Sequence, residues 1–113
     1  MDNVKNDAYY IERILNDLAY ISRHMKEVDS QAFSSDEILQ DAMMFRLIQI
    51  SENARKLTDK YKERYSIIPW TAMYGLRNRI VHDYGNVDMG IVFDTLKSDI
   101  PALMNLITKE LCN

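Results

Sequence analysis

Glycine and proline are scarce in this chain, which has only three glycines and two prolines among its 113 residues. An all-β domain needs a turn about every 8 to 12 residues, and turns depend heavily on these two residue types. The helix-favouring residues Leu, Met, Ala, Lys and Glu are common instead. The sequence therefore predicts an all-α fold, an antiparallel bundle of four or five helices, in one domain that spans residues 1–113.

The cysteine, histidine and hydropathy patterns argue against several classes of protein. Cys112 is the only cysteine, so neither an internal disulfide nor a Cys-rich zinc site can form. The sequence has no His-x-x-x-His pair, no tight carboxylate triad and no Gly-rich phosphate loop. Residues 1–7 have no apolar stretch of secretory type, and nowhere do about 18 apolar residues run without a charge, so we expect neither secretion nor a membrane span. We expect a cytoplasmic protein with no metal site, no cofactor and no membrane contact.

The spacing of apolar residues predicts two long helices in the first half of the chain. Intervals of alternately four and three residues predict the first helix over residues 4–28. Its expected inward positions are Val4, Ala8, Ile11, Leu15, Leu18, Ser22 and Met25, widened by Tyr10, Ile14, Ile21 and Val28. Ser34 and Glu37 have the spacing of a capping box, which predicts the start of a second helix that runs to about Thr58.

Proline and glycine divide the second half of the chain. Pro69 disfavours helical geometry at the preceding residue and predicts a connector before a third helix over residues 70–82. The segment Tyr84-Gly85-Asn86 ends that helix, and Asp88 is the expected N-cap of a fourth. Pro101 should kink or restart the fourth helix. The residues expected to face inward there are Ile91, Val92, Thr95, Leu96, Ile100, Leu103, Leu106, Ile107 and Leu111.

Positive charge is concentrated in the middle third of the chain. The net charge is −3, which argues against a general nucleic-acid binder, yet residues 46–79 hold eight Lys and Arg against three Asp and Glu. The basic residues are Arg46, Arg55, Lys56, Lys60, Lys62, Arg64, Arg77 and Arg79, interleaved with Tyr61, Tyr65, Trp70 and Tyr74. This region is either a solvated helix face or a track that binds phosphates beside aromatic faces for bases.

Polar chemistry gathers in the segment Gly75-Leu76-Arg77-Asn78-Arg79-Ile80-Val81-His82-Asp83-Tyr84. Because buried polar groups need partners, these side chains either point to solvent or line a cleft. A structural alternative is that His82 stabilises a helix dipole and that the arginines pair with acids. Glu52 is either a surface residue or a buried partner for a cation such as Arg77. His24 is expected to be exposed and without a role.

The residue types in this segment suit phosphodiester cleavage. A histidine can accept and return a proton near neutral pH, and a guanidinium can hold a phosphoryl group through two parallel hydrogen bonds. With RNA as substrate, the neighbouring 2′-hydroxyl can be the nucleophile, so the reaction does not require a metal.

The spacing of Arg77 and His82 constrains how they can meet. They are five residues apart, or about 140° around an ideal helix, so they do not share a face. They can converge only if the helix ends near Val81 or if a two-fold dimer supplies the other half, and we expect a composite dimer cleft. Asn78 lies four residues before His82 on one face and can orient the imidazole.

The spacing of Arg77, His82 and Tyr84 resembles the signature of HEPN-domain toxins of the HepT type, the partners of minimal nucleotidyltransferase (MNT) antitoxins. The similar segments between residues 67 and 101 are Ile67-Ile68-Pro69-Trp70, the segment from Gly75 to Tyr84, Val87-Asp88 and Asp99-Ile100-Pro101. The segment Ser51-Glu52-Asn53-Ala54-Arg55-Lys56-Leu57 is similar more loosely.

This resemblance implies a helical homodimer that acts as a metal-independent ribonuclease, arrests growth and has an MNT-type antitoxin. Carried onto this sequence, Arg77 would stabilise the scissile phosphate and His82 would be the general acid or base. Tyr84 would be the tyrosine that the antitoxin modifies with AMP. The expected supporting residues are Asn78, Arg79 and Glu52.

Three residues depart from the family pattern near this site. Ser51 and Asn53 flank Glu52 where small residues are expected, and Gly85 follows Tyr84 where many relatives have an aromatic. These departures are expected to reshape the mouth of the cleft.

Two functions follow from the sequence. The first is a toxin ribonuclease that cuts RNA and not DNA. The alternative is a non-catalytic helical module that dimerises and holds a nucleotidyltransferase or a nucleotide.

Overall fold

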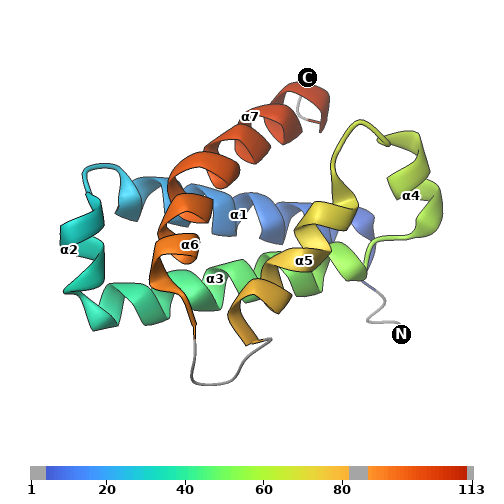
Figure 1. Cartoon of the computed structure of the whole chain (residues 1–113). Helices are drawn as coiled ribbons and strands as arrows, with labels where there is room; N and C mark the ends of the chain where they lie inside the picture. The colour runs from blue at the N-terminus through green and yellow to red at the C-terminus, as the bar shows by residue number, and fades with distance from the viewer. Residues whose placement is uncertain (1–4, 82–86, 112–113) are drawn as a thin grey trace.

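The computed structural model describes residues 5–81 and 87–111, and these form helices and connectors without a strand among them (Figure 1). The predicted all-α fold is confirmed. The helices are α1 (Asp7–Met25), α2 (Ser30–Ser34), α3 (Glu37–Arg55), α4 (Asp59–Arg64), α5 (Trp70–Val81), α6 (Met89–Asp94) and α7 (Ile100–Leu111), with a π-helical turn, Thr95–Asp99, between the last two. No helix in the described ranges is both long and apolar enough to span a membrane.

Two long antiparallel helices form the base of the bundle. Figure 1 shows α1 and α3 side by side and running in opposite directions, with α5 lying across α3 and the α6–α7 arm closing over α1. The side chains that fill the space between these elements are fully buried. They include Ile14, Leu18, Ile21, Met43, Leu47, Ile50, Met73, Leu96, Ile100 and Ile107.

The inward face of α1 is centred differently from the prediction. The two isoleucines that were expected only to widen the face, Ile14 and Ile21, are among its most buried residues. Leu15 and Ser22 are half-buried and Ala8 is exposed, while Val4 lies outside the described residues. The core therefore follows the spacing of the large aliphatic side chains, because their burial removes the most apolar surface from water.

The predicted capping box before α3 is wrong. Asp36 caps α3, and its Oδ1 accepts a hydrogen bond from the Leu39 amide at 3.0 Å. Ser34 lies inside the short helix α2, where its hydroxyl donates to the Ser30 carbonyl at 2.8 Å. A carboxylate is a better cap here than a hydroxyl, because it also interacts favourably with the positive end of the helix dipole.

The second long helix ends earlier than predicted. It stops at Arg55, and Thr58 begins α4 by accepting a hydrogen bond from the Tyr61 amide at 3.2 Å. Asp7 fixes this break, since its carboxylate accepts hydrogen bonds from the Thr58 amide and hydroxyl, each at 2.8 Å. The basic run from Arg55 to Arg64 is therefore divided between two helices.

Local signals in the second half of the chain predicted the structure well. The third helix begins at Trp70 as expected and is described to Val81, and Asp88 caps α6 by accepting from the Gly90 amide at 2.9 Å. The expected break at residues 84–86 lies outside the described residues, as do His82 and Cys112.

The predicted restart of the helix near Pro101 is confirmed. Pro101 has no N–H to donate to the Lys97 carbonyl, and the chain forms a π-helical turn just before it, in which the Ile100 amide donates to the Thr95 carbonyl. Val92, Leu96 and Ile100 face inward as expected. The inward position expected for Ile91 is wrong, because its side chain is 51% exposed.

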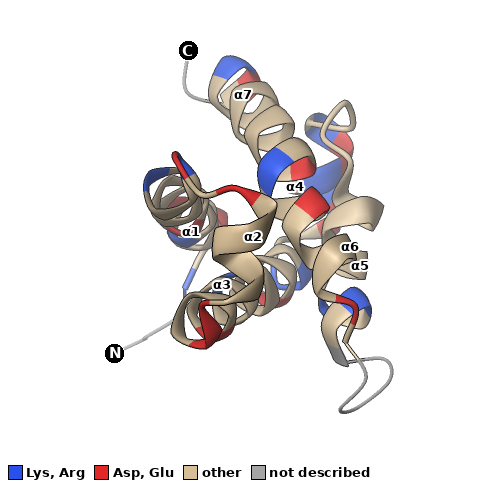
Figure 2. Ribbon diagram, turned by 60° about the vertical axis from the view of Figure 1, so that its left-hand side comes forward, with Lys and Arg blue, Asp and Glu red and all other residues tan. Residues whose placement is uncertain are grey.

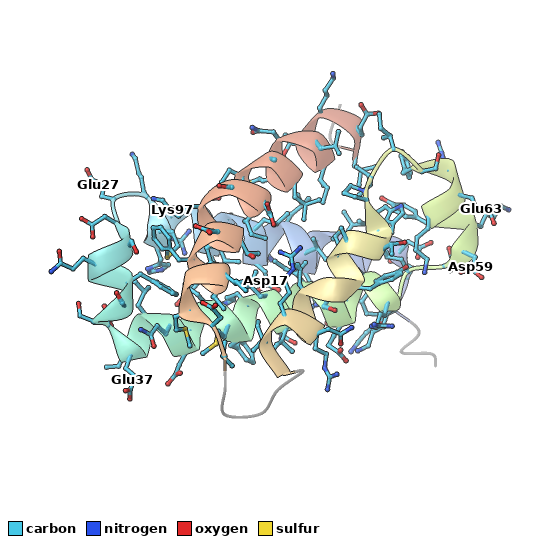
Figure 3. All side chains as sticks on the ribbon, in the orientation of Figure 1. Asp17, Glu27, Glu37, Asp59, Glu63 and Lys97 are labelled. Atoms are coloured by element: carbon cyan, nitrogen blue, oxygen red, sulfur yellow. The ribbon has the colours of Figure 1, made fainter. Side chains whose placement is uncertain are left out.

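A partly buried ion pair joins α1 to α3. Arg46 Nη1 donates to Asp17 Oδ1 at 2.9 Å, and the guanidinium carbon lies 3.7 Å from the centre of the Tyr20 ring. Asp17 lies in the interior of the bundle (Figure 3), and its second carboxylate oxygen has no hydrogen-bond partner. Burial raises the pKa of the Asp17 carboxyl, although Arg46 and Arg13 act in the opposite direction. Arg46 is therefore part of the helix packing and not of an exposed basic track.

Replacing Asp17 should change how stability depends on pH. Because its pKa is raised above 3.8 in the folded state, the folded protein holds this proton more tightly than the unfolded chain. The stability from this group is present below about pH 4 and is lost as the pH rises through the raised pKa. Asp17→Asn removes this loss. The difference in free energy of unfolding, variant minus wild type, should therefore increase as the pH rises from 4 to 7 in urea titrations. A difference that stays constant with pH would contradict this assignment.

Candidate functional site

The last turns of α5 present polar side chains to solvent. Trp70, Met73, Leu76 and Ile80 form the buried face of this helix. Arg77, Asn78 and Arg79 lie between these buried positions and are exposed. The sequence left open whether these side chains point to solvent or line a cleft. In the structure all three are exposed to solvent.

Arg77 is paired with Glu52 of α3. Arg77 Nε lies 3.5 Å from Glu52 Oε2, and the two side chains are 48% and 44% exposed. The sequence left open whether Glu52 is a surface residue or a buried partner for a cation. In the structure Glu52 is the partner of Arg77, but it is half-exposed and not buried. A contact through Nε uses only one of the five N–H groups of a guanidinium.

A hydrogen bond between α3 and α5 fixes the position of this pair. Ser51 is fully buried, and its hydroxyl donates to the Tyr74 carbonyl at 2.9 Å. Ser51 precedes Glu52, and Tyr74 lies one turn before Arg77. The only sign of this contact in the sequence is a small polar residue in an apolar helix.

The two departures beside Glu52 therefore lie inside the fold and not at the mouth of a cleft. The second of them, Asn53, is also buried, and its amide donates to the Gln49 carbonyl of the same helix at 3.0 Å. The third, Gly85, lies outside the described residues.

Arg79 points to a different part of the structure. Its Nη1 donates to Thr95 Oγ1 at 2.9 Å and to Asp99 Oδ2 at 3.0 Å, both on the π-helical turn. Arg77 and Arg79 are two residues apart, which is about 200° around the helix. The structure therefore does not bring Arg79 together with Arg77, and Arg79 instead connects α5 to the segment that leads into α7.

The basic residues near α4 are engaged with tyrosine rings. Arg55 lies 5.1 Å and Lys62 lies 5.0 Å from the centre of the Tyr74 ring. Trp70 is buried and donates its indole N–H to the Lys62 and Tyr65 carbonyls. Trp70 therefore does not provide the open aromatic face that the phosphate-and-base track required. Figure 2 shows Lys and Arg on α4 and near the end of α5.

Two hollows flank α5, and Arg77 lines neither. One of about 370 Å³ lies between α5 and α7, with a largely apolar lining that includes Ala72, Leu76 and Leu103. The other, of about 510 Å³, lies between α4 and the start of α5. The Arg77 side chain is 48% exposed, so the candidate site is reached directly from solvent. Among residues 5–81 and 87–111, no three His, Cys, Asp or Glu side chains are grouped to hold a metal ion.

Comparison with known families identifies the chain. Residues 14–110 match the family described as "Ribonuclease HepT-like". This chain belongs to the HepT-like ribonuclease family. The expected family resemblance is confirmed, and the HepT-like match includes Glu52, both arginines of α5 and the positions of His82 and Tyr84.

Several relatives of this HepT-like chain carry ribonuclease names. A Thermococcus cleftensis protein named "Probable ribonuclease HepT" is 30% identical, and the alignment covers 83% of this chain and 86% of that protein. One from Caldanaerobacter subterraneus subsp. tengcongensis, named "Putative RNase TTE0752", is 28% identical, with 88% and 89% covered.

A longer relative comes from Methanocaldococcus jannaschii and is named "Gamma-glutamylcyclotransferase and putative RNase MJ0434". It is 30% identical over 93% of this chain, but the chain spans only about half, 47%, of its length. No solved structure matches the chain.

The contact between Arg79 and Asp99 should contribute modestly to stability. Both side chains are about half exposed, so the ion pair is screened by water. We expect Arg79→Met to lower the free energy of unfolding by about 1 kcal/mol, because it also removes the hydrogen bond to Thr95. A double-mutant cycle with Asp99→Asn in urea titrations isolates the pair. A coupling energy of zero would show that the contact does not join α5 to the π-helical turn.

Proposed function

We propose that this protein is a ribonuclease and the toxin of a toxin–antitoxin pair. The observation that carries the proposal is the exposed Arg77 guanidinium, held by Glu52 at the end of α5 in a chain of the HepT-like family. The names of the relatives supply the class of reaction. The exposed position of Arg77 suits a chain-like substrate such as RNA.

In this proposal Arg77 binds the phosphate and Glu52 orients Arg77. Glu52 contacts Arg77 at Nε, which orients the guanidinium and leaves its Nη edge to donate two parallel hydrogen bonds to the oxygens of a phosphoryl group. The half-exposed ion pair costs little to rearrange, because pairs of this kind contribute about 0 to 1 kcal/mol. The guanidinium then stabilises the negative charge that builds on the phosphoryl oxygens during cleavage.

His82 supplies proton transfer in this proposal. It removes the proton of the RNA 2′-hydroxyl, whose oxygen attacks the adjacent phosphorus while the bond to the 5′-oxygen breaks. The products are a 2′,3′-cyclic phosphate and a 5′-hydroxyl, whose oxygen receives its proton from the protonated imidazole of His82. Asn78, four residues before His82, orients the imidazole. The nucleophile belongs to the RNA, so the step needs no metal.

A homodimer supplies the complete site. Arg77 and His82 are about 140° apart on an ideal helix, so a cleft between two subunits provides a route by which their side chains converge. The cognate MNT-type antitoxin, a nucleotidyltransferase, transfers AMP to Tyr84. The bulky anionic adduct lies two residues from His82, where it blocks the cleft and repels RNA.

Arg77→Ala and His82→Ala should each abolish RNA cleavage and growth arrest. Each removes either charge stabilisation or proton transfer, and such losses lower rates by on the order of 100-fold or more. The measurement is cleavage of RNA by the purified protein in the presence of a chelator, with growth followed during expression. Arg23→Ala, which removes an exposed arginine of α1, is the matched control and should retain activity.

One result would contradict the proposed mechanism, and another would contradict the ribonuclease activity. Cleavage of a substrate that carries 2′-deoxyribose at the cut site would contradict attack by the 2′-hydroxyl. Intact RNA and normal growth with the wild-type protein would favour the binding module that only holds a nucleotidyltransferase.

Tyr84→Phe should make the protein resistant to its antitoxin. Phenylalanine has no hydroxyl to accept AMP, so the variant should remain toxic when the nucleotidyltransferase is co-expressed. Intact-mass analysis should find one adenylyl group on the wild type and on Tyr9→Phe, the control at an exposed tyrosine, but none on Tyr84→Phe. Full neutralisation of Tyr84→Phe would show that the antitoxin acts by occlusion and not by modification.

A further inference from the structure

Two cations lie beside the side chain of Tyr74, which is one turn before Arg77 on α5. The Arg55 guanidinium carbon is 5.1 Å from the centre of the Tyr74 ring, and the Lys62 ammonium donates a hydrogen bond to the Tyr74 hydroxyl. Lys62 also lies 3.7 Å from Asp59, but the Asp59 side chain is 93% exposed, so water screens this ion pair. In the part of the chain that the structure describes, no carboxylate pairs with Arg55. The two cations therefore leave an excess of positive charge around one ring.

The same three side chains hold hydrogen-bond donors that are not used within the described residues. The Tyr74 hydroxyl accepts from Lys62, so its own hydrogen is left to donate. The ammonium of Lys62 has two more N–H groups, and Arg55 gives none of its five to an oxygen in residues 5–81 and 87–111. A phosphate carries negative charge and only acceptor oxygens, so it can satisfy all three side chains at once.

The cluster of Arg55, Lys62 and Tyr74 lies one helical turn from the candidate site. Arg55 follows Glu52 by three residues on α3, and Tyr74 precedes Arg77 by three residues on α5. Side chains three residues apart on a helix are neighbours. Successive phosphates of one strand are about 3.4 Å apart along the axis of a stacked duplex and further apart in an extended strand. One turn of α5, about 5.4 Å, therefore matches one nucleotide step of an extended strand.

We propose that Arg55, Lys62 and Tyr74 form a second phosphate site, which binds the RNA phosphate next to the scissile one. The RNA strand then runs from Arg77 along α5 toward α4. Basic and aromatic side chains that follow one another along a surface are a common means of binding single strands. This inference rests on the proposed function, because it takes the phosphate at Arg77 to be the one that is cut.

The hollow between α4 and the start of α5 gives room for the nucleoside attached to the second phosphate. Lys62 and Tyr74 line this hollow, which has a volume of about 510 Å³. Small-molecule sites in proteins commonly have volumes of about 300 to 1,000 Å³. Asp59 and Glu63 also line it, but both are exposed and project outward from α4 in Figure 3. Solvent therefore screens their repulsion of a phosphate.

The second phosphate does not react, so contact with it strengthens the binding of the substrate and of the transition state equally. Such uniform binding lowers KM and leaves kcat unchanged. The three residues are therefore expected to bind and position the RNA and to take no part in breaking its backbone.

Removing the two cations should weaken RNA binding. Arg55→Met and Lys62→Met should each raise the dissociation constant of a short single-stranded RNA with 2′-O-methyl riboses, which cannot be cut, by on the order of tenfold. The double variant should reduce the slope of log affinity against log salt concentration by about 0.7, the value for one phosphate of a single strand. Lys60→Met, at an exposed lysine of α4, is the matched control and should bind like the wild type. Fluorescence anisotropy measures both quantities.

Altered substrates distinguish a phosphate contact from a change in folding. A strand with one ribose among 2′-O-methyl riboses is cut at one place, which defines the two neighbouring phosphates. Replacing the phosphate on one of these sides by a neutral methylphosphonate should raise the KM of the wild type about tenfold and leave kcat unchanged. The same replacement should not raise the KM of the double variant further, because the changes in protein and RNA remove the same contact. Lys62→Arg keeps the charge and should retain the wild-type KM.

The second phosphate site and the ribonuclease activity can fail independently. A double variant that binds and cuts RNA like the wild type would overturn the site and leave the activity standing, as would a methylphosphonate that weakens both proteins equally. A wild type that does not bind the uncleavable RNA would also overturn the site. A wild type that binds RNA through these residues and leaves it intact would support the site and overturn the proposed activity.

Discussion

The packing of α5 across the C-terminal half of α3 determines where the candidate site lies. Met73 and Leu76 are buried in this contact region, and the Ser51 hydroxyl donates to the Tyr74 carbonyl at 2.9 Å. Because Glu52 follows Ser51 and Arg77 lies one turn after Tyr74, the distance between Glu52 and Arg77 is set by core packing. Burial of each large apolar side chain contributes about 1.5 to 3 kcal/mol, so the rigid part of the fold holds the exposed pair in place.

Residues of α3 form two ion pairs that involve an arginine, and these pairs differ in burial and therefore in role. The Asp17 carboxylate paired with Arg46 is buried, and removing one partner from such a pair is costly, so this contact serves packing. The Glu52–Arg77 pair is half-exposed and longer, at 3.5 Å, so an incoming phosphate can exchange with the carboxylate at little cost. Burial therefore separates a structural arginine from one suited to ligand binding, although both belong to the same basic third of the sequence.

Local signals predicted much of this fold, and contacts between distant residues account for several errors. Pro69, Asp88 and Pro101 act on their immediate neighbours, and the helix boundaries near them were predicted closely. The break at Thr58 depends on Asp7, which is 51 residues away, and the role of Arg46 depends on Asp17, which is 29 residues away. The candidate site was predicted only in part. The pairing of Glu52 with Arg77 was one of two alternatives. The contacts of Arg79 with Thr95 and Asp99 had no signal in the sequence.

The charge balance of the chain limits how a phosphate can be attracted to Arg77. A chain with a net charge of −3 has no general positive field to steer an anionic ligand toward the site. The carboxylate nearest to Arg77 belongs to Glu52, and its charge is offset by the guanidinium with which it is paired. Binding of a phosphate at this site would therefore depend on the local contact with Arg77 and not on long-range attraction.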